Sequence, residues 1–84
     1  MQHLTPETLG ARIIAFLRDE MGIEDDLTVD TPLVSSGLVD SVGLMRLATF
    51  VERETGVIVP DQDVNVGHFD TVRQIVDYLG NRAA

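Results

Sequence analysis

An aspartate and a serine stand side by side in the run Gly37-Leu38-Val39-Asp40-Ser41-Val42, where a turn-like segment meets an apolar periodic one. A serine hydroxyl can attack as a nucleophile, accept a covalent modification, or cap a helix by accepting a backbone N–H. Capping is the commonest role for a serine at a helix start. Assigning chemistry to Ser41 therefore needs evidence beyond the pair itself.

A hydrolytic triad would require a base and an acid beside Ser41, and His68 and Asp70 have the right side chains. The turn that exposes a nucleophilic serine is absent, because Val39 stands where that motif needs glycine. The sequence therefore disfavours an esterase, and we expect His68 on the surface.

Acidic residues at Glu24, Asp26 and Asp30 suggest calcium ligands, but the glycine and the terminal glutamate of a calcium-binding loop are missing. The chain has no cysteine, and its two histidines are far apart. We therefore expect no metal site.

Three helices are predicted around these residues. In the first, Thr5 is the N-cap, Pro6 takes the first helical position, and Gly22 ends the helix. Its apolar stripe is Leu9, Ile13, Phe16 and Leu17. The second helix begins near Asp40-Ser41 and ends at Gly56, with an apolar stripe of Leu44, Leu47, Ala48 and Val51.

The last helix opens at Asp70-Thr71, where Thr71 and Gln74 match a capping box, and is expected to end at Gly80-Asn81. Its apolar stripe is Val72, Ile75, Val76 and Leu79. Asn65 is expected to cap a single extra turn over residues 66–69.

The connecting segments lack helical periodicity. Residues 21–37 are expected to form a long loop, held to the core by Leu27, Val29, Leu33 and Val34. Residues 57–59 have no partner strand and are expected to be an extended connector. The fold class is all-α: a four-helix bundle of three main helices and one short helix with a long first loop, in one domain spanning residues 1–84.

Charge and hydropathy narrow the possible functions. The net charge is −8, with six arginines and no lysine. Such a surface repels nucleic acid and anionic membranes and favours basic partners. The apolar runs are too short to span a bilayer, and the N-terminus has no signal-peptide pattern. We expect a free-standing, monomeric, cytoplasmic protein.

Three parts of the chain resemble the acyl and peptidyl carrier proteins. They are the run from Gly37 to Val42, the segment 51–61 that ends in Pro60-Asp61, and the segment 69–79 that begins with Phe69-Asp70. The distances between these segments also fit the family, and the resemblance as a whole extends over roughly residues 5–80. The resemblance implies that Ser41 carries covalent 4'-phosphopantetheine, and that Asp40 helps to present the site to a phosphopantetheinyl transferase.

The same resemblance implies a carrier and not an enzyme. A thioester on the arm would hold an acyl or aminoacyl group, supplied by a loading ligase and consumed by downstream synthase or transferase enzymes. A phosphodiester on Ser41 would also lie at a helix N-terminus, which favours an anion.

A partner-docking strip is expected along the second helix at Val42, Met45, Arg46 and Thr49. The alternative for Met45 is that it fills the core. Fatty-acid carriers have a strongly acidic second helix, whereas this one has Arg46 and Arg53, with Gly43 where a polar residue is usual. Phe50 is expected to narrow an interior cavity and so to favour a short or polar cargo.

These departures favour a specialised polyketide or nonribosomal peptide pathway, including carriers of the D-alanyl type. Two alternatives remain: a fatty-acid-type acyl carrier, and an unmodified acidic helical adaptor.

Overall fold

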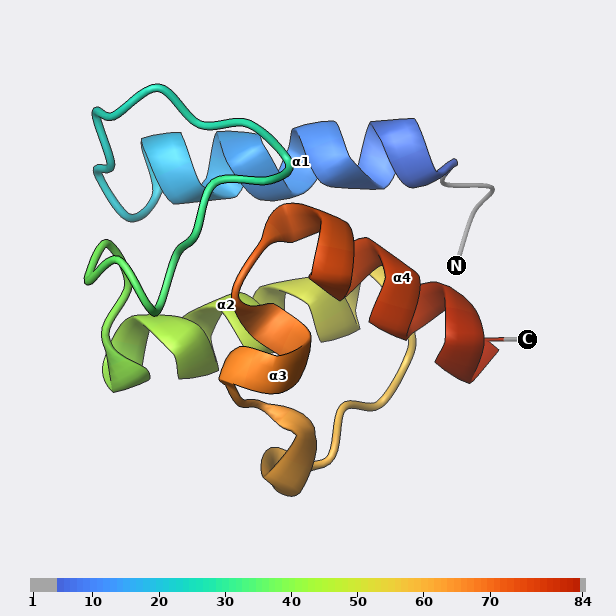
Figure 1. Ribbon diagram of the computed structural model, residues 1–84. Coiled ribbons are helices and arrows are strands. Elements are labelled where there is room, and N and C mark those ends of the chain that lie inside the picture. Colours follow the sequence, from blue (N-terminus) through green and yellow to red (C-terminus); the bar gives the residue numbers. More distant parts are fainter. Residues whose placement is uncertain (1–4, 84) are drawn as a thin grey trace.

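The computed structural model describes residues 5–83, which form four α-helices and one short 3-10 helix (Figure 1). The elements are α1 (Pro6–Asp19), α2 (Ser41–Thr55), η1 (Asp61–Asp63), α3 (Val66–Phe69) and α4 (Val72–Ala83). No strand occurs in this part of the chain, so residues 57–59 are a connector as expected. The predicted all-α class, with three main helices, one short helix and a long first loop, is confirmed.

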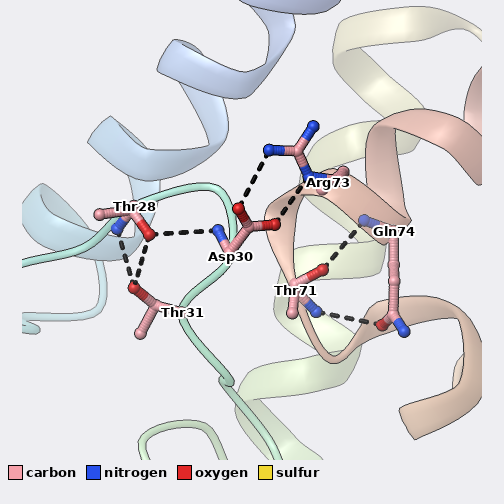
Figure 2. Close-up of polar contacts among 6 residues, drawn as sticks. All are labelled: Thr28, Asp30, Thr31, Thr71, Arg73 and Gln74. Carbon is pink, nitrogen blue, oxygen red and sulfur yellow. Dashed lines mark hydrogen bonds and ion pairs between the residues drawn. The ribbon is translucent and has the colours of Figure 1, made fainter.

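Local signals placed most helix ends correctly. The Thr5 hydroxyl oxygen accepts a hydrogen bond from the Thr8 N–H at 3.1 Å, and Pro6 occupies the first position of α1. Gly56 ends α2 in the left-handed conformation, with φ of 73°. Thr71 and Gln74 form the predicted capping box. Each side chain accepts a hydrogen bond from the other residue's backbone N–H, and Figure 2 shows both bonds.

The expected end of the last helix is wrong. The helix α4 continues through Gly80 and Asn81 to Ala83. Gly80 is not among the glycines with positive φ, so it does not adopt the conformation that reverses the chain. A glycine inside a helix costs only about 1 kcal/mol relative to alanine, and a helix can pass through it.

The loop between α1 and α2 doubles back along α1 before it descends to the start of α2 (Figure 1). Of its expected anchors, Leu27 and Leu33 are buried, and Val29 and Val34 are partly buried against the core. The loop thus forms part of the core. The largest fully buried side chains come from every α-helix and from this loop: Phe69, Ile13, Leu17, Leu33, Leu47, Ile75, Val39, Val51 and Val72.

A single carboxylate, between α3 and α4, fastens the second half of the loop. Asp70 Oδ1 accepts hydrogen bonds from the backbone N–H groups of Val34 (2.8 Å) and Ser35 (2.9 Å), and Oδ2 accepts one from the Ser35 hydroxyl (2.8 Å). The Asp70 carbonyl accepts a fourth from the Leu33 N–H at 2.7 Å. Burial alone would raise the pKa of Asp70, but the hydrogen bonds from Ser35, Val34 and Leu33 outweigh it and lower the pKa.

A second contact holds the first half of the loop, as Figure 2 shows. The guanidinium of Arg73 makes two hydrogen bonds to the Asp30 carboxylate, at 2.7 and 3.0 Å. Outside the view of Figure 2, the backbone N–H of Arg73 also donates to the Val29 carbonyl. The hydrogen bond from Arg73 lowers the pKa of Asp30. Because this pair is exposed, its contribution to stability is small.

Asp70→Asn removes the charge of the loop anchor with little change in size. We expect the free energy of unfolding at pH 7 to fall by about 1.5–3 kcal/mol, the usual contribution of hydrogen bonds to a charged group. Urea unfolding followed by circular dichroism measures this change.

The pH dependence of the free energy of unfolding should show whether the Asp70 charge causes this loss of stability. A lowered pKa in the folded state means that ionised Asp70 stabilises the protein above its unfolded pKa, near 3.9, and that this stabilisation is lost as the pH falls through the folded value. The gap between wild type and Asp70→Asn should therefore close on acidification. A gap that stays constant down to the acid transition would contradict the anchor role of the carboxylate.

Candidate functional site

Asp40 caps the N-terminus of α2. Its backbone is extended, with φ of −89° and ψ of −177°, and Oδ1 accepts a hydrogen bond from the Gly43 N–H at 2.8 Å. Its carbonyl accepts from the Leu44 N–H at 2.8 Å, which closes the first turn. Asp40 therefore performs the capping that the sequence alone left open for Ser41.

Ser41 is the first residue of α2 and is exposed to solvent. Its hydroxyl makes no hydrogen bond within residues 5–83. A side chain with this environment contributes little to the fold and remains accessible to an enzyme. The capping alternative for Ser41 is thus excluded by the geometry.

The loop holds the start of α2 in place. The Val39 N–H donates to the Leu33 carbonyl at 2.9 Å, and Leu33 in turn is hydrogen-bonded to Asp70. Gly37 turns the chain with φ of 85°, a conformation that favours glycine. Val39 is itself buried. Ser41 is therefore presented from a rigid junction and not from a free loop.

A hollow of about 330 Å³ lies beside Ser41, between the end of the loop and the first turns of α2. Its walls are Met21, Gly37, Leu38, Val39, Asp40, Val42, Gly43 and Arg46. Gly43 forms part of one wall, and a Cβ there would lie 2.6 Å from the terminal methyl carbon of Met21 and 3.1 Å from Val39 Cγ1. A larger residue at position 43 would therefore require the flexible Met21 side chain to move.

Sequence reasoning missed Met21 and Leu38 as parts of this region. Met21 lies 20 positions before Ser41, and no local pattern connects the two. Leu38 belongs to the signature run itself, and its position two residues before Asp40 was the available signal.

The four residues of the predicted docking strip are all exposed. The exposed fractions of Val42 and Met45 are 70% and 46%, so Met45 does not fill the core. The Thr49 hydroxyl donates to the Met45 carbonyl at 3.1 Å, and Arg46 Nη2 donates to the Glu20 carbonyl at 3.4 Å. The docking role itself stays a prediction.

The expectation for Phe50 is wrong. Its ring stacks on Phe16 of α1, with centroids 4.2 Å apart, and it is only partly buried. Two hollows lined by Phe50, among residues 5–83, are open to solvent. Phe50 lies on the face of α2 that packs against α1, so it does not narrow an interior cavity, and the inference from Phe50 to cargo size has no support.

His68 and Asp70 do not form a triad with Ser41. The carboxylate of Asp70 is occupied by the loop, and the exposed His68 ring lies against Tyr78 with centroids 4.9 Å apart. Asp30, one of the three acidic residues that suggested calcium, pairs with Arg73. Within residues 5–83 no group of three acidic or histidine side chains is placed to hold a metal ion, and no helix there is long and apolar enough to cross a membrane.

The division of roles between Asp40 and Ser41 predicts different effects on stability. Ser41→Ala should change the free energy of unfolding by no more than about 0.5 kcal/mol, as for other exposed positions. Asp40→Ala should lower it by about 0.5–2 kcal/mol through loss of the cap. Chemical denaturation of both variants measures the two effects, and a larger loss for Ser41→Ala than for Asp40→Ala would reverse the assignment.

Comparison with known proteins agrees with this geometry. The family described as "Phosphopantetheine attachment site" matches residues 11–79. The "D-alanyl carrier protein 1" of Lactiplantibacillus plantarum (strain ATCC BAA-793 / NCIMB 8826 / WCFS1) is 26% identical over 78 residues, which cover 93% of this chain and 98% of the relative. Because the family match spans most of the chain, the protein belongs to the phosphopantetheine-binding carrier proteins, whose cofactor is covalent 4'-phosphopantetheine.

Proposed function

We propose that Ser41 is the attachment point of the 4'-phosphopantetheine and that the loaded protein delivers an acyl or aminoacyl group to partner enzymes. The observation that carries this proposal is the unused hydroxyl of Ser41, exposed at the first position of α2 while the adjacent Asp40 does the capping. The signature run Gly37 to Val42 supports the same residue.

The residues present fit the group. A phosphodiester on Ser41 would meet the first turn of α2, where the backbone N–H groups at the helix start favour negative charge. In the transfer from coenzyme A, a bond forms between the serine oxygen and phosphorus. The bond to the nucleotide part of the coenzyme breaks and the hydroxyl proton is released. Once attached, the group supplies the terminal thiol that holds the cargo as a thioester.

A short acyl or aminoacyl cargo is our proposal for what the arm carries. The relative named as a D-alanyl carrier supports an aminoacyl cargo. The centre of the bundle is filled by large buried side chains, among them Phe69 and Leu47, which favours a cargo that stays outside the core. A specialised polyketide or nonribosomal peptide pathway fits such a cargo. A fatty-acid-type carrier is the alternative within the family.

Partner enzymes are proposed to dock on the strip formed by Val42, Met45, Arg46 and Thr49. These residues are exposed on α2 close to Ser41, and an exposed methionine adapts to several partners in turn. The partners that dock there would be a loading ligase and a downstream synthase or transferase. A phosphopantetheinyl transferase would be a further partner, which recognises mainly the Asp40-Ser41 end of α2. We further propose that residues 1–84 form one monomeric carrier domain that works in the cytoplasm.

Intact-mass measurement tests the attachment site. The purified protein is incubated with coenzyme A, magnesium and a broad-specificity phosphopantetheinyl transferase. Wild type should gain the mass of one phosphopantetheine, and Ser41→Ala should gain none, because the accepting oxygen is gone.

Ser36→Ala is the matched control for the loss of a serine. Ser36 lies in the preceding loop, and its hydroxyl is already used, donating to the Pro32 carbonyl at 2.6 Å. This variant should be modified like wild type. An unmodified wild type would favour the adaptor alternative, and modification of Ser41→Ala would move the site elsewhere.

A charge on the strip tests the docking proposal. Met45→Glu should leave the transferase reaction largely intact, because Ser41 and the Asp40 cap are untouched. It should slow loading by a cognate ligase, because it places a carboxylate on the apolar part of the strip. Steady-state loading of holo-protein with radiolabelled amino acid measures this, with Ile58→Glu as the control at an exposed apolar residue outside α2. Equal loss in both variants, or no loss in either, would contradict the strip.

A further inference from the structure

The hollow beside Ser41 combines apolar walls with one guanidinium. Met21, Leu38 and Val42 supply apolar surface, and Arg46, one turn after Val42 along α2, also lines the hollow. Its volume of about 330 Å³ is at the lower end of the range of about 300–1,000 Å³ for small-ligand pockets. Such a hollow suits part of a small, flexible, anionic ligand.

The charge of Arg46 is available in this hollow. The guanidinium of Arg46 makes one hydrogen bond within residues 5–83, the 3.4 Å contact with the Glu20 carbonyl, and it forms no ion pair there. A guanidinium has five N–H donors, so most of them remain for a ligand. By contrast, Arg12 is paired with Glu54 and Arg73 with Asp30.

The one carboxylate among the walls belongs to Asp40. Its Oδ1 is engaged by the Gly43 N–H, so its orientation is set by the cap. A second anion placed next to it would be repelled unless a cation balanced the charge, and Arg46 is the cation in the hollow. The hollow therefore selects a ligand that brings a negative charge towards Arg46 and apolar groups towards Met21 and Leu38.

We infer that this hollow is the resting site of the arm attached to Ser41. The phosphodiester pairs with Arg46, and the branched apolar part of the arm lies against Met21, Leu38 and Val42. This inference rests on the proposed function, because it needs the arm to be attached at Ser41. Attachment also makes a shallow site sufficient, since a tethered ligand has a high effective concentration.

The resting site and the proposed docking strip share Val42 and Arg46. A partner that covers these two residues would displace the arm from the hollow. Docking and release of the arm are then coupled, so that the thiol becomes mobile when an enzyme is in place to use it.

Comparison of apo and holo protein by NMR tests the inference. Uniformly labelled protein is converted with coenzyme A and transferase, and intact mass confirms complete loading. In holo wild type, the amides of Gly37 and Leu38 and the methyl group of Met21 should shift relative to apo protein. Nuclear Overhauser contacts should connect the Met21 methyl with the methyl groups of the arm.

Arg46→Gln removes the cation, and Arg53→Gln makes the same exchange at another exposed arginine of α2 that does not line the hollow. Holo Arg46→Gln should lose most of the shifts at Met21 and Gly37, whereas holo Arg53→Gln should retain them. Added salt should reduce the shifts in wild type, because it screens the ion pair.

The outcomes separate the two proposals. Failure to gain mass would overturn the proposed function. Full gain of mass with shifts confined to residues 40–42, and with no contact to the arm from Met21, would overturn the resting site alone. Equal shifts in holo Arg46→Gln and holo wild type would remove Arg46 from it.

Discussion

The carboxylate of Asp70 joins two parts of the chain that must be placed together for the site to exist. This carboxylate accepts three hydrogen bonds from Val34 and Ser35, and the backbone carbonyl of Asp70 accepts a fourth from Leu33. Leu33 then holds Val39 through a backbone hydrogen bond, two residues before Ser41. The corner between α3 and α4 therefore determines where α2 begins. The long loop needs this constraint because it has no regular secondary structure of its own.

Most of the helical framework could be predicted because its signals are local. The Thr5 cap, the capping box of Thr71 and Gln74, and the left-handed Gly56 each depend on residues within one turn of the helix. The Asp70 anchor could not be predicted, since its partners lie 35 and 36 positions away and neither residue type is unusual in a loop. Gly80 shows the limit of a local rule: glycine permits a helix to end but does not require it.

The candidate site likewise has a part that the sequence predicts and a part that only the structure reveals. The Asp40-Ser41 pair was visible in the sequence, although only the structure shows which of the two residues caps α2. The hollow beside them depends on the approach of Met21 to Gly43, two residues whose proximity follows from the path of the whole loop. Phe50 was misplaced for a different reason. Its expected place beside an interior cavity came from the comparison with fatty-acid carriers, whereas in this protein its ring packs on Phe16 of α1.

The separation between Asp40 and Ser41 has a consequence for how the protein can be recognised. A group added to the Ser41 oxygen displaces no hydrogen bond found in residues 5–83, and the cap that starts α2 remains with its neighbour. If the arm is attached at Ser41, as proposed, the unmodified, modified and loaded states can share one backbone. Enzymes that must distinguish these states would have to read the appended chemistry itself, and an artificial label of similar linkage could be exchanged at this position without redesign of the scaffold.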